Sequence, residues 1–155
     1  TLTINLRSSA SPYNITESKK NVFDSVSGVT AVSFSLAVNG TSYYLEVRHR
    51  NSIATWSAAP VLCSSNAMSY DFTTELAQAY GSNQISVSGV PSFYSGDVNQ
   101  DETIDASDVS ETDNDAFSSV SGYVRTDVTG DDFVDAGDVS IVDNNAFNAV
   151  SVVTP

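Results

Sequence analysis

Two acidic segments of twelve residues, thirty positions apart, constrain this chain more than any other feature. They read Asp97-Val-Asn-Gln-Asp-Glu-Thr-Ile-Asp-Ala-Ser-Asp108 and Asp127-Val-Thr-Gly-Asp-Asp-Phe-Val-Asp-Ala-Gly-Asp138. Both place oxygen-bearing side chains at positions 1, 3, 5, 9 and 12, from which a helix-flanked loop coordinates Ca²⁺. A solvated acidic linker has no reason to repeat this register, so the repeat favours a pair of metal-binding loops.

The predicted metal ligands follow from this register. Position 7 needs only its backbone carbonyl, so its side chain can vary. Position 8 is β-branched in both segments (Ile104 and Val134), which favours a short strand contact that ties the two loops together. A cage of six or seven protein oxygens suits Ca²⁺ better than Mg²⁺. The predicted ligands of two Ca²⁺ ions are Asp97, Asn99, Asp101, Thr103, Asp105, Asp108, Asp127, Thr129, Asp131, Phe133, Asp135 and Asp138.

The repeat continues beyond the loops, since Val109–Val120 aligns without gaps with Val139–Val150. Apolar residues in both stretches fall at helical spacing, which predicts a short amphipathic helix after each loop. This loop-helix unit resembles the dockerin family, in which the last loop ligand is Asp, as at Asp108 and Asp138. The resemblance covers about residues 96–151. It implies two bound Ca²⁺ ions, an extracellular module and a cohesin partner.

The second loop and the turn positions depart from the usual pattern. The Gly expected at position 6 is Glu102 in the first loop and Asp132 in the second, and position 3 of the second loop is the weaker ligand Thr129. Positions 10 and 11 are Ala106-Ser107 and Ala136-Gly137, where dockerins commonly carry a Ser-Thr pair. We expect both sites to fill at extracellular calcium concentrations without being very tight.

The charge distribution divides the chain into two domains. Residues 1–96 carry five acids and five bases, whereas residues 97–155 carry 14 acids and one base, so the whole net charge of −13 lies there. Such acidity argues against nucleic acid or an anionic membrane as partner. No apolar run approaches the roughly 20 residues of a membrane span. We therefore predict a domain over 1–90, a linker over 91–96 and a metal-binding module over 97–155.

The N-terminal part has the pattern of a β domain. Thr1–Arg7 alternates, and Val32–Val38 and Tyr43–Val47 flank the turn Asn39-Gly40, which predicts a hairpin. The stretch Gly40–Arg48 resembles prealbumin-like and carboxypeptidase-regulatory-like sandwiches. The predicted fold class is mainly β plus small α, with an Ig-like or prealbumin-like β-sandwich before the calcium module. Further strands are expected at Ile53–Trp56, Met68–Phe72 and Ile85–Val87.

Residues with catalytic potential are few. The lone His49 lies between two arginines at a strand end, and the lone Cys63 is expected to be a small buried hydrophobe. The acids outside the loops form no pair of the kind a glycosidase needs. We expect a protein that is not an enzyme. Asn14 and Asn39 stand in N-glycosylation sequons, which chiefly indicate exposure.

Three functions compete at this level. The first is a structural subunit of an extracellular bacterial surface layer or fibre, whose partners are other copies of itself or a neighbouring surface protein. The second is a dockerin that attaches a cargo to a scaffold bearing a cohesin-like domain. The third is a glycan-binding module that uses Trp56, Tyr43, Tyr44 or Tyr80. The residues predicted for assembly are Leu2, Ile4, Leu6, Arg48, Arg50, Val152 and Val153. Of these, the basic spot of Arg48 and Arg50 is expected to meet the acidic module, either within the chain or on a neighbouring copy.

Overall fold

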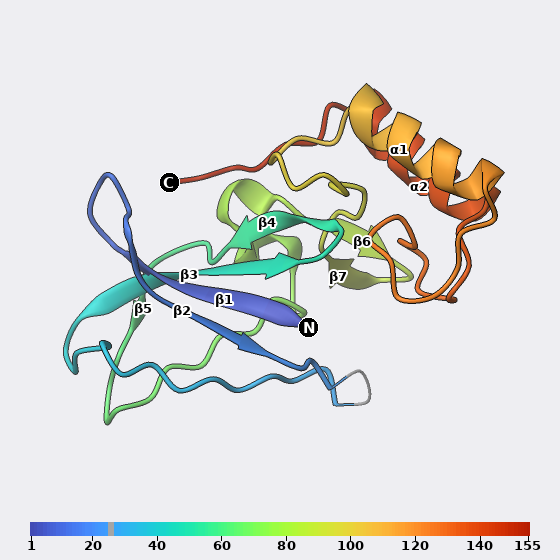
Figure 1. The fold of residues 1–155 in the computed structure, drawn as a ribbon. Helices are drawn as coiled ribbons and strands as arrows, with labels where there is room; N and C mark the ends of the chain where they lie inside the picture. Colours follow the sequence, from blue (N-terminus) through green and yellow to red (C-terminus); the bar gives the residue numbers. More distant parts are fainter. Residues whose placement is uncertain (25–26) are drawn as a thin grey trace. The chain divides into compact units, whose positions relative to one another are not determined.

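The computed structural model of the chain describes residues 1–24 and 27–155 (Figure 1). The chain is mainly β with two helices, and its sheets are antiparallel, as the sequence predicts at that level. None of the helices in these two ranges combines the length and apolar character needed to cross a membrane. The elements are β1 (Leu2–Ser8), β2 (Ile15–Asn21), β3 (Ser42–His49), β4 (Ser52–Trp56), β5 (Val61–Leu62), η1 (Leu76–Gln78), η2 (Tyr80–Ser82), β6 (Ile85–Val87), β7 (Val90–Ser92), α1 (Ala106–Phe117) and α2 (Ala136–Phe147).

The chain divides into two compact units. The first comprises Thr1–His49, Ala54–Ser92 and Val153–Pro155, and the second comprises Arg50–Ile53 and Phe93–Val152. The second unit therefore takes in the tip Arg50–Ile53, which comprises the turn after β3 and the first two residues of β4 and is far from the acidic repeat in sequence. The basic residues Arg48 and Arg50 are the signal in the sequence that connects this region with the acidic repeat.

The first unit contains a five-stranded sheet in the order β2-β1-β3-β4, with β5 also paired to β3. The described strands form this sheet and the two-stranded pair β6-β7, and this arrangement does not confirm the expected sandwich. β1 is confirmed, and Ile4 and Leu6 are buried as its alternation predicts. β2 lies at the sheet edge, where Lys19 and Lys20 discourage pairing with other chains. Its polar sequence has no alternating pattern, which is why it is not predicted.

The predicted hairpin is wrong in its first half. β3 forms, but residues 32–38 are irregular, and Leu36 and Val38 are exposed. After the turn the chain pairs with β5, where Ser42 lies opposite Leu62. The Glu17 carboxylate also accepts the Leu36 N–H at 2.7 Å, a donor that a strand partner would otherwise use. The expected strand Met68–Phe72 is irregular too, whereas β4 and β6 match their predicted positions.

Each unit has its own core. In the first unit Leu6, Tyr43 and Cys63 are buried together, so Cys63 is the small buried hydrophobe that we expect. In the second unit the buried residues Ile53, Ile104, Val142 and Val150 pack together and join the tip, the first loop and the second helix. Burial of this apolar cluster stabilises the packing of both acidic loops, since Val128 of the second loop also packs against it.

Candidate metal centre

The last residue of each loop is buried at the start of the following helix. Asp105 caps α1 by accepting the Ser107 N–H at 2.7 Å, and the Asp108 carboxylate accepts the Asp105 N–H at 3.0 Å. Asp135 and Asp138 repeat this capping box on α2. Such a box satisfies helix N–H groups that have no partner inside the helix.

The same two carboxylates close their loops. Asp108 also accepts N–H groups from Val98 at 2.9 Å and Asn99 at 3.2 Å, and its exposed fraction is 0%. Asp138 accepts the equivalent N–H groups of Val128 at 2.8 Å and Thr129 at 2.9 Å, and it is equally buried. Each position-12 carboxylate therefore joins the beginning of its loop to the helix that ends it.

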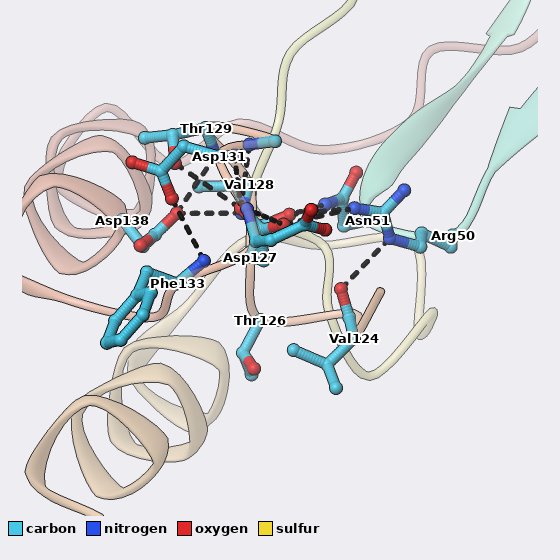
Figure 2. A network of polar contacts seen from close by, with 12 residues as sticks. Arg50, Asn51, Val124, Thr126, Asp127, Val128, Thr129, Asp131, Phe133 and Asp138 are labelled. Carbon is cyan, nitrogen blue, oxygen red and sulfur yellow. Dashed lines mark hydrogen bonds and ion pairs between the residues drawn. The ribbon is translucent and has the colours of Figure 1, made fainter. Parts of the chain in front are cut away.

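The position-1 carboxylates fold the middle of each loop. Asp97 accepts N–H groups from Asp101 at 3.1 Å and Glu102 at 3.3 Å. Asp127 accepts N–H groups from Gly130, Asp131 and Asp132 at 2.7, 3.3 and 3.2 Å. Figure 2 labels Asp127 and Asp131 among the residues of this network. Both aspartates are nearly inaccessible, with exposed fractions of 2% and 1%. The two loops thus share one backbone geometry despite different side chains between the ligand positions.

Position 6 of each loop adopts the left-handed conformation that normally favours glycine. The φ angle is 76° at Glu102 and 68° at Asp132. Left-handed backbone costs a residue with a Cβ roughly 1–2 kcal/mol. The N–H bonds from both residues to the position-1 carboxylates help to hold this turn.

The position-8 residues pair differently from the prediction. Ile104 donates its N–H to the Val150 carbonyl at 2.8 Å, and Val134 donates to Val120 at 3.0 Å. Each loop therefore pairs with the segment that follows the other repeat's helix, as the bridges Thr103–Ser151 and Ser121–Phe133 also show. The predicted direct contact between the two loops is wrong. The segment after each helix pairs with the loop of the other repeat, and this reciprocal pairing joins the two repeats. The sequence of one repeat gives no sign of it.

In the first loop, the charged form of Asp97 is disfavoured when no metal is bound. Burial, together with repulsion from Asp108, raises the pKa of Asp97 to about 6, although N–H bonds from Glu102 and Asp101 lower it in part. Within residues 1–24 and 27–155, Asp97 has hydrogen bonds from N–H groups but no basic partner. A divalent cation would offset this repulsion.

The remaining predicted ligands lie nearer the surface of the loops. Asp101, Asp105, Asp131 and Asp135 are exposed, and the Asn99 amide donates to Asp101 and Ser107 at 3.0 and 2.9 Å. No three acidic or histidine side chains of the described residues converge into a ready-made ion site. The donor set nevertheless fits a hard cation, because every candidate ligand is an oxygen.

Arg50, one of the two residues of the predicted basic spot, lies beside the second loop within the chain. It contacts Asp127 within the chain, with 3.7 Å between its Nη2 and the carboxylate Oδ2. The sequence shows a basic residue at a strand end and an acidic repeat, but no spacing rule connects them. The predicted assembly partner Arg48 pairs with Glu46 in the first unit.

The other predicted interface residues are engaged within the chain. Leu2, Ile4 and Leu6 belong to β1, which is paired on both sides. Val152 donates its N–H to Glu102 at 2.9 Å, and an added Cβ at Gly81 would come within 2.7 Å of Val153 Cγ1. The sequon residues Asn14 and Asn39 are both exposed, as expected.

The chain matches no protein-family model, no curated protein and no solved structure.

Proposed function

We propose that this chain is a non-catalytic, calcium-stabilised structural protein of a bacterial cell surface, a subunit of a surface layer or fibre. The observation that supports it best is the duplicated loop, in which two pairs of buried carboxylates have the same hydrogen-bond pattern: Asp97 with Asp108, and Asp127 with Asp138. Buried carboxylates within one loop repel each other, and a divalent cation would convert this repulsion into binding energy.

Two Ca²⁺ ions would be held by side-chain oxygens and by one backbone carbonyl per loop. Bound there, each ion would offset part of the negative charge of its loop and cross-link the loop to the following helix. The residues that would hold them are Asp97, Asn99, Asp101, Thr103, Asp105 and Asp108 in the first loop, and Asp127, Thr129, Asp131, Phe133, Asp135 and Asp138 in the second.

We extend the proposal to the identity of the two parts. The acidic part is dockerin-like, supported by the capping boxes, by Asp at position 12 and by two twelve-residue helices. The N-terminal part is related to Ig-like or prealbumin-like sandwiches, supported only by its antiparallel sheet and by the stretch that forms β3. Both are extracellular modules in this proposal.

Assembly through the terminal segments would require strand exchange. β1 has both edges paired, and Val152 and Val153 pack on their own chain, so another copy can gain these contacts only by replacing them. Exchange of an identical element is a low-cost route to oligomers.

Sedimentation velocity and negative-stain electron microscopy of the full chain test assembly and metal dependence together. We expect assemblies in millimolar Ca²⁺ and their loss with chelator. The double variant D108N/D138N should not assemble, whereas D113N/D143N removes the same charge from exposed helix positions and should assemble normally. A wild-type chain that stays monomeric in millimolar Ca²⁺ would refute the assembly proposal.

One observation favours the second candidate, a dockerin that binds a cohesin-like partner. The two helices retain an identical exposed stripe although their buried positions differ, as at Thr112 and Val142. Within it Phe117 and Phe147 are 92% and 90% exposed. Packing within the chain does not explain such exposure, but recognition would. The stripe consists of Ser110, Asp113, Asn114 and Phe117 in α1 and Ser140, Asp143, Asn144 and Phe147 in α2.

Binding to a panel of cohesin-like domains tests this candidate. The variant F117S/F147S should lose capture, and the exposed Val22→Ser substitution in the first unit should not. The glycan-binding candidate has less support, because Trp56, Tyr43 and Tyr44 are buried and offer no stacking platform. The fourth candidate, Tyr80, is half-buried and packs edge-to-face against Tyr44, with ring centroids 6.1 Å apart. Silence on a glycan array would remove the glycan-binding candidate.

A further inference from the structure

The tip Arg50–Ile53 contacts both loops, but in chemically different ways. At the second loop, Arg50 donates to the Val124 carbonyl at 2.9 Å and to the Asp127 carbonyl at 3.1 Å (Figure 2). Its guanidinium carbon lies 3.8 Å from the centre of the Tyr123 ring. Asn51 is a second donor to the Asp127 carbonyl, at 2.8 Å. All of these residues belong to the second compact unit.

The contact with the first loop is neutral. The Gln100 amide donates to the Ser52 carbonyl at 3.4 Å and to the Asp97 carbonyl at 2.6 Å. Gly130 occupies the equivalent position of the second loop and has no side chain to do the same. Thus one position-1 aspartate is supported by an amide and its counterpart by a guanidinium.

This difference has an electrostatic consequence. An arginine remains charged at every accessible pH, and its planar donors fit carbonyl and carboxylate oxygens. With the Arg50 guanidinium 3.7 Å from the Asp127 carboxylate, part of the role of a bound cation is already filled. The same positive charge would repel a divalent ion that used Asp127 as a ligand.

We propose that Arg50 is a built-in counter-cation that makes the two calcium sites unequal. The second loop keeps its folded shape without metal and binds Ca²⁺ more weakly, whereas the first loop depends on Ca²⁺ and binds it more tightly. This inference rests on the proposed calcium binding and adds a division of labour between the two sites. The identical loop registers would otherwise suggest equal sites.

Calorimetric titration of the chelator-stripped full chain with CaCl₂ tests the inference. We expect two affinities that differ roughly tenfold or more. D127N should abolish the weaker one and D97N the tighter one. R50Q, which keeps an amide donor but removes the charge, should tighten the weaker site and bring the two affinities within about threefold. R125Q is the matched control, because Arg125 pairs with the exposed edge of α1 at Glu111 rather than with a loop.

Amide hydrogen exchange of the metal-free protein provides a second readout that does not need calcium. Residues 127–138 should be better protected than residues 97–108 in the wild type, and R50Q should remove the difference. Two bound ions whose affinity ratio R50Q leaves unchanged would overturn the inference while the calcium proposal stands. A wild-type chain that binds no Ca²⁺ would overturn both.

Discussion

At the residue scale, two buried carboxyl groups have pKa values shifted in opposite directions. Glu46 in the first unit is completely buried and receives hydrogen bonds from Arg7, Arg48 and Asn5. Burial alone would raise the pKa of Glu46, but these donors outweigh it and hold the pKa below its ordinary value of 4.5. Asp97 in the second unit has only N–H donors, and its pKa is raised to about 6. The two units should therefore respond to acid in opposite directions.

Replacing Glu46 with Gln should lower the free energy of unfolding of the first unit by about 3 kcal/mol at pH 7, because two arginines lose their carboxylate. A lowered pKa stabilises the fold above the ordinary value of 4.5, and this contribution disappears as pH falls through the folded pKa. The gap between variant and wild type should therefore narrow below about pH 4.5 in urea titrations. Glu75→Gln, an exposed control, should change little at any pH.

Replacing Asp97 with Asn should raise the metal-free stability of the second unit by about 1 kcal/mol at neutral pH, because repulsion from Asp108 is removed while some N–H bonds weaken. A raised pKa stabilises the fold below the ordinary value of 3.8, and this stability is lost as pH rises through about 6. The metal-free wild type should accordingly melt higher at pH 5 than at pH 8.

The matched substitution Asp127→Asn should have the opposite sign, because it breaks the contact with Arg50. Thermal melts in chelator, followed by far-ultraviolet circular dichroism, measure both effects. Equal shifts for the two variants would contradict the electrostatic account of the loops.

At the scale of elements, the decisive feature is the reciprocal pairing of the two repeats. Each loop takes its strand partner from the end of the other repeat, through the N–H bonds of Ile104 and Val134. Neither repeat completes its own loop, so we expect neither to fold alone. The segment after α2 is therefore structural rather than a free tail.

Deleting residues 150–155 should unfold the second unit, at a cost of at least about 4 kcal/mol, because the buried Val150 and the partners of Glu102 and Ile104 are lost. The measurement is limited proteolysis of the truncated chain, which should be cleaved within residues 97–149. Deleting only Thr154 and Pro155 is the control and should leave the unit resistant. A resistant 1–149 chain would show that the repeats fold without the exchange.

Local sequence patterns correctly predicted the elements whose formation does not depend on which distant segment they pair with. The alternation of β1, the position of β4 and the helices after the loops follow from the residues themselves. The segment Val32–Val38 has an ideal strand pattern but does not pair with β3. Its Leu36 N–H donates to the Glu17 carboxylate, and β3 pairs with β5 instead. β2 has no such pattern and forms because β1 offers it an edge. Pairing between distant segments decides these cases, and periodicity does not encode it.

The candidate site shows the same division. The loop registers and the turns at position 6 follow from spacing and residue type. The capping boxes were not predicted and are seen only in the structure. The Arg50 contact and the exchange of repeat ends depend on how the chain returns on itself. The charges alone suggest that the basic spot at Arg48 and Arg50 meets the acidic module, but they do not give the loop or the residue that Arg50 contacts. The exchange of repeat ends has no signal in a single sequence.

At the scale of the whole molecule, charge and stability are divided between two compact units. The N-terminal residues are electrically balanced and keep their one buried acid neutralised by arginines, whereas the repeat carries the entire net charge of −13. Self-repulsion of that size destabilises a compact state. Under the proposed function, the fold of this module would depend on extracellular Ca²⁺.

The most direct test is thermal unfolding of the chelator-stripped full chain, with and without about 1 mM Ca²⁺. If the free Ca²⁺ concentration is about 100 times the dissociation constant of each site, the melting temperature of the helical second unit should rise by roughly 10 °C or more. Two ions should bind per chain. The double variant D108N/D138N should show no shift. A wild-type melting curve that Ca²⁺ leaves unchanged would contradict the account.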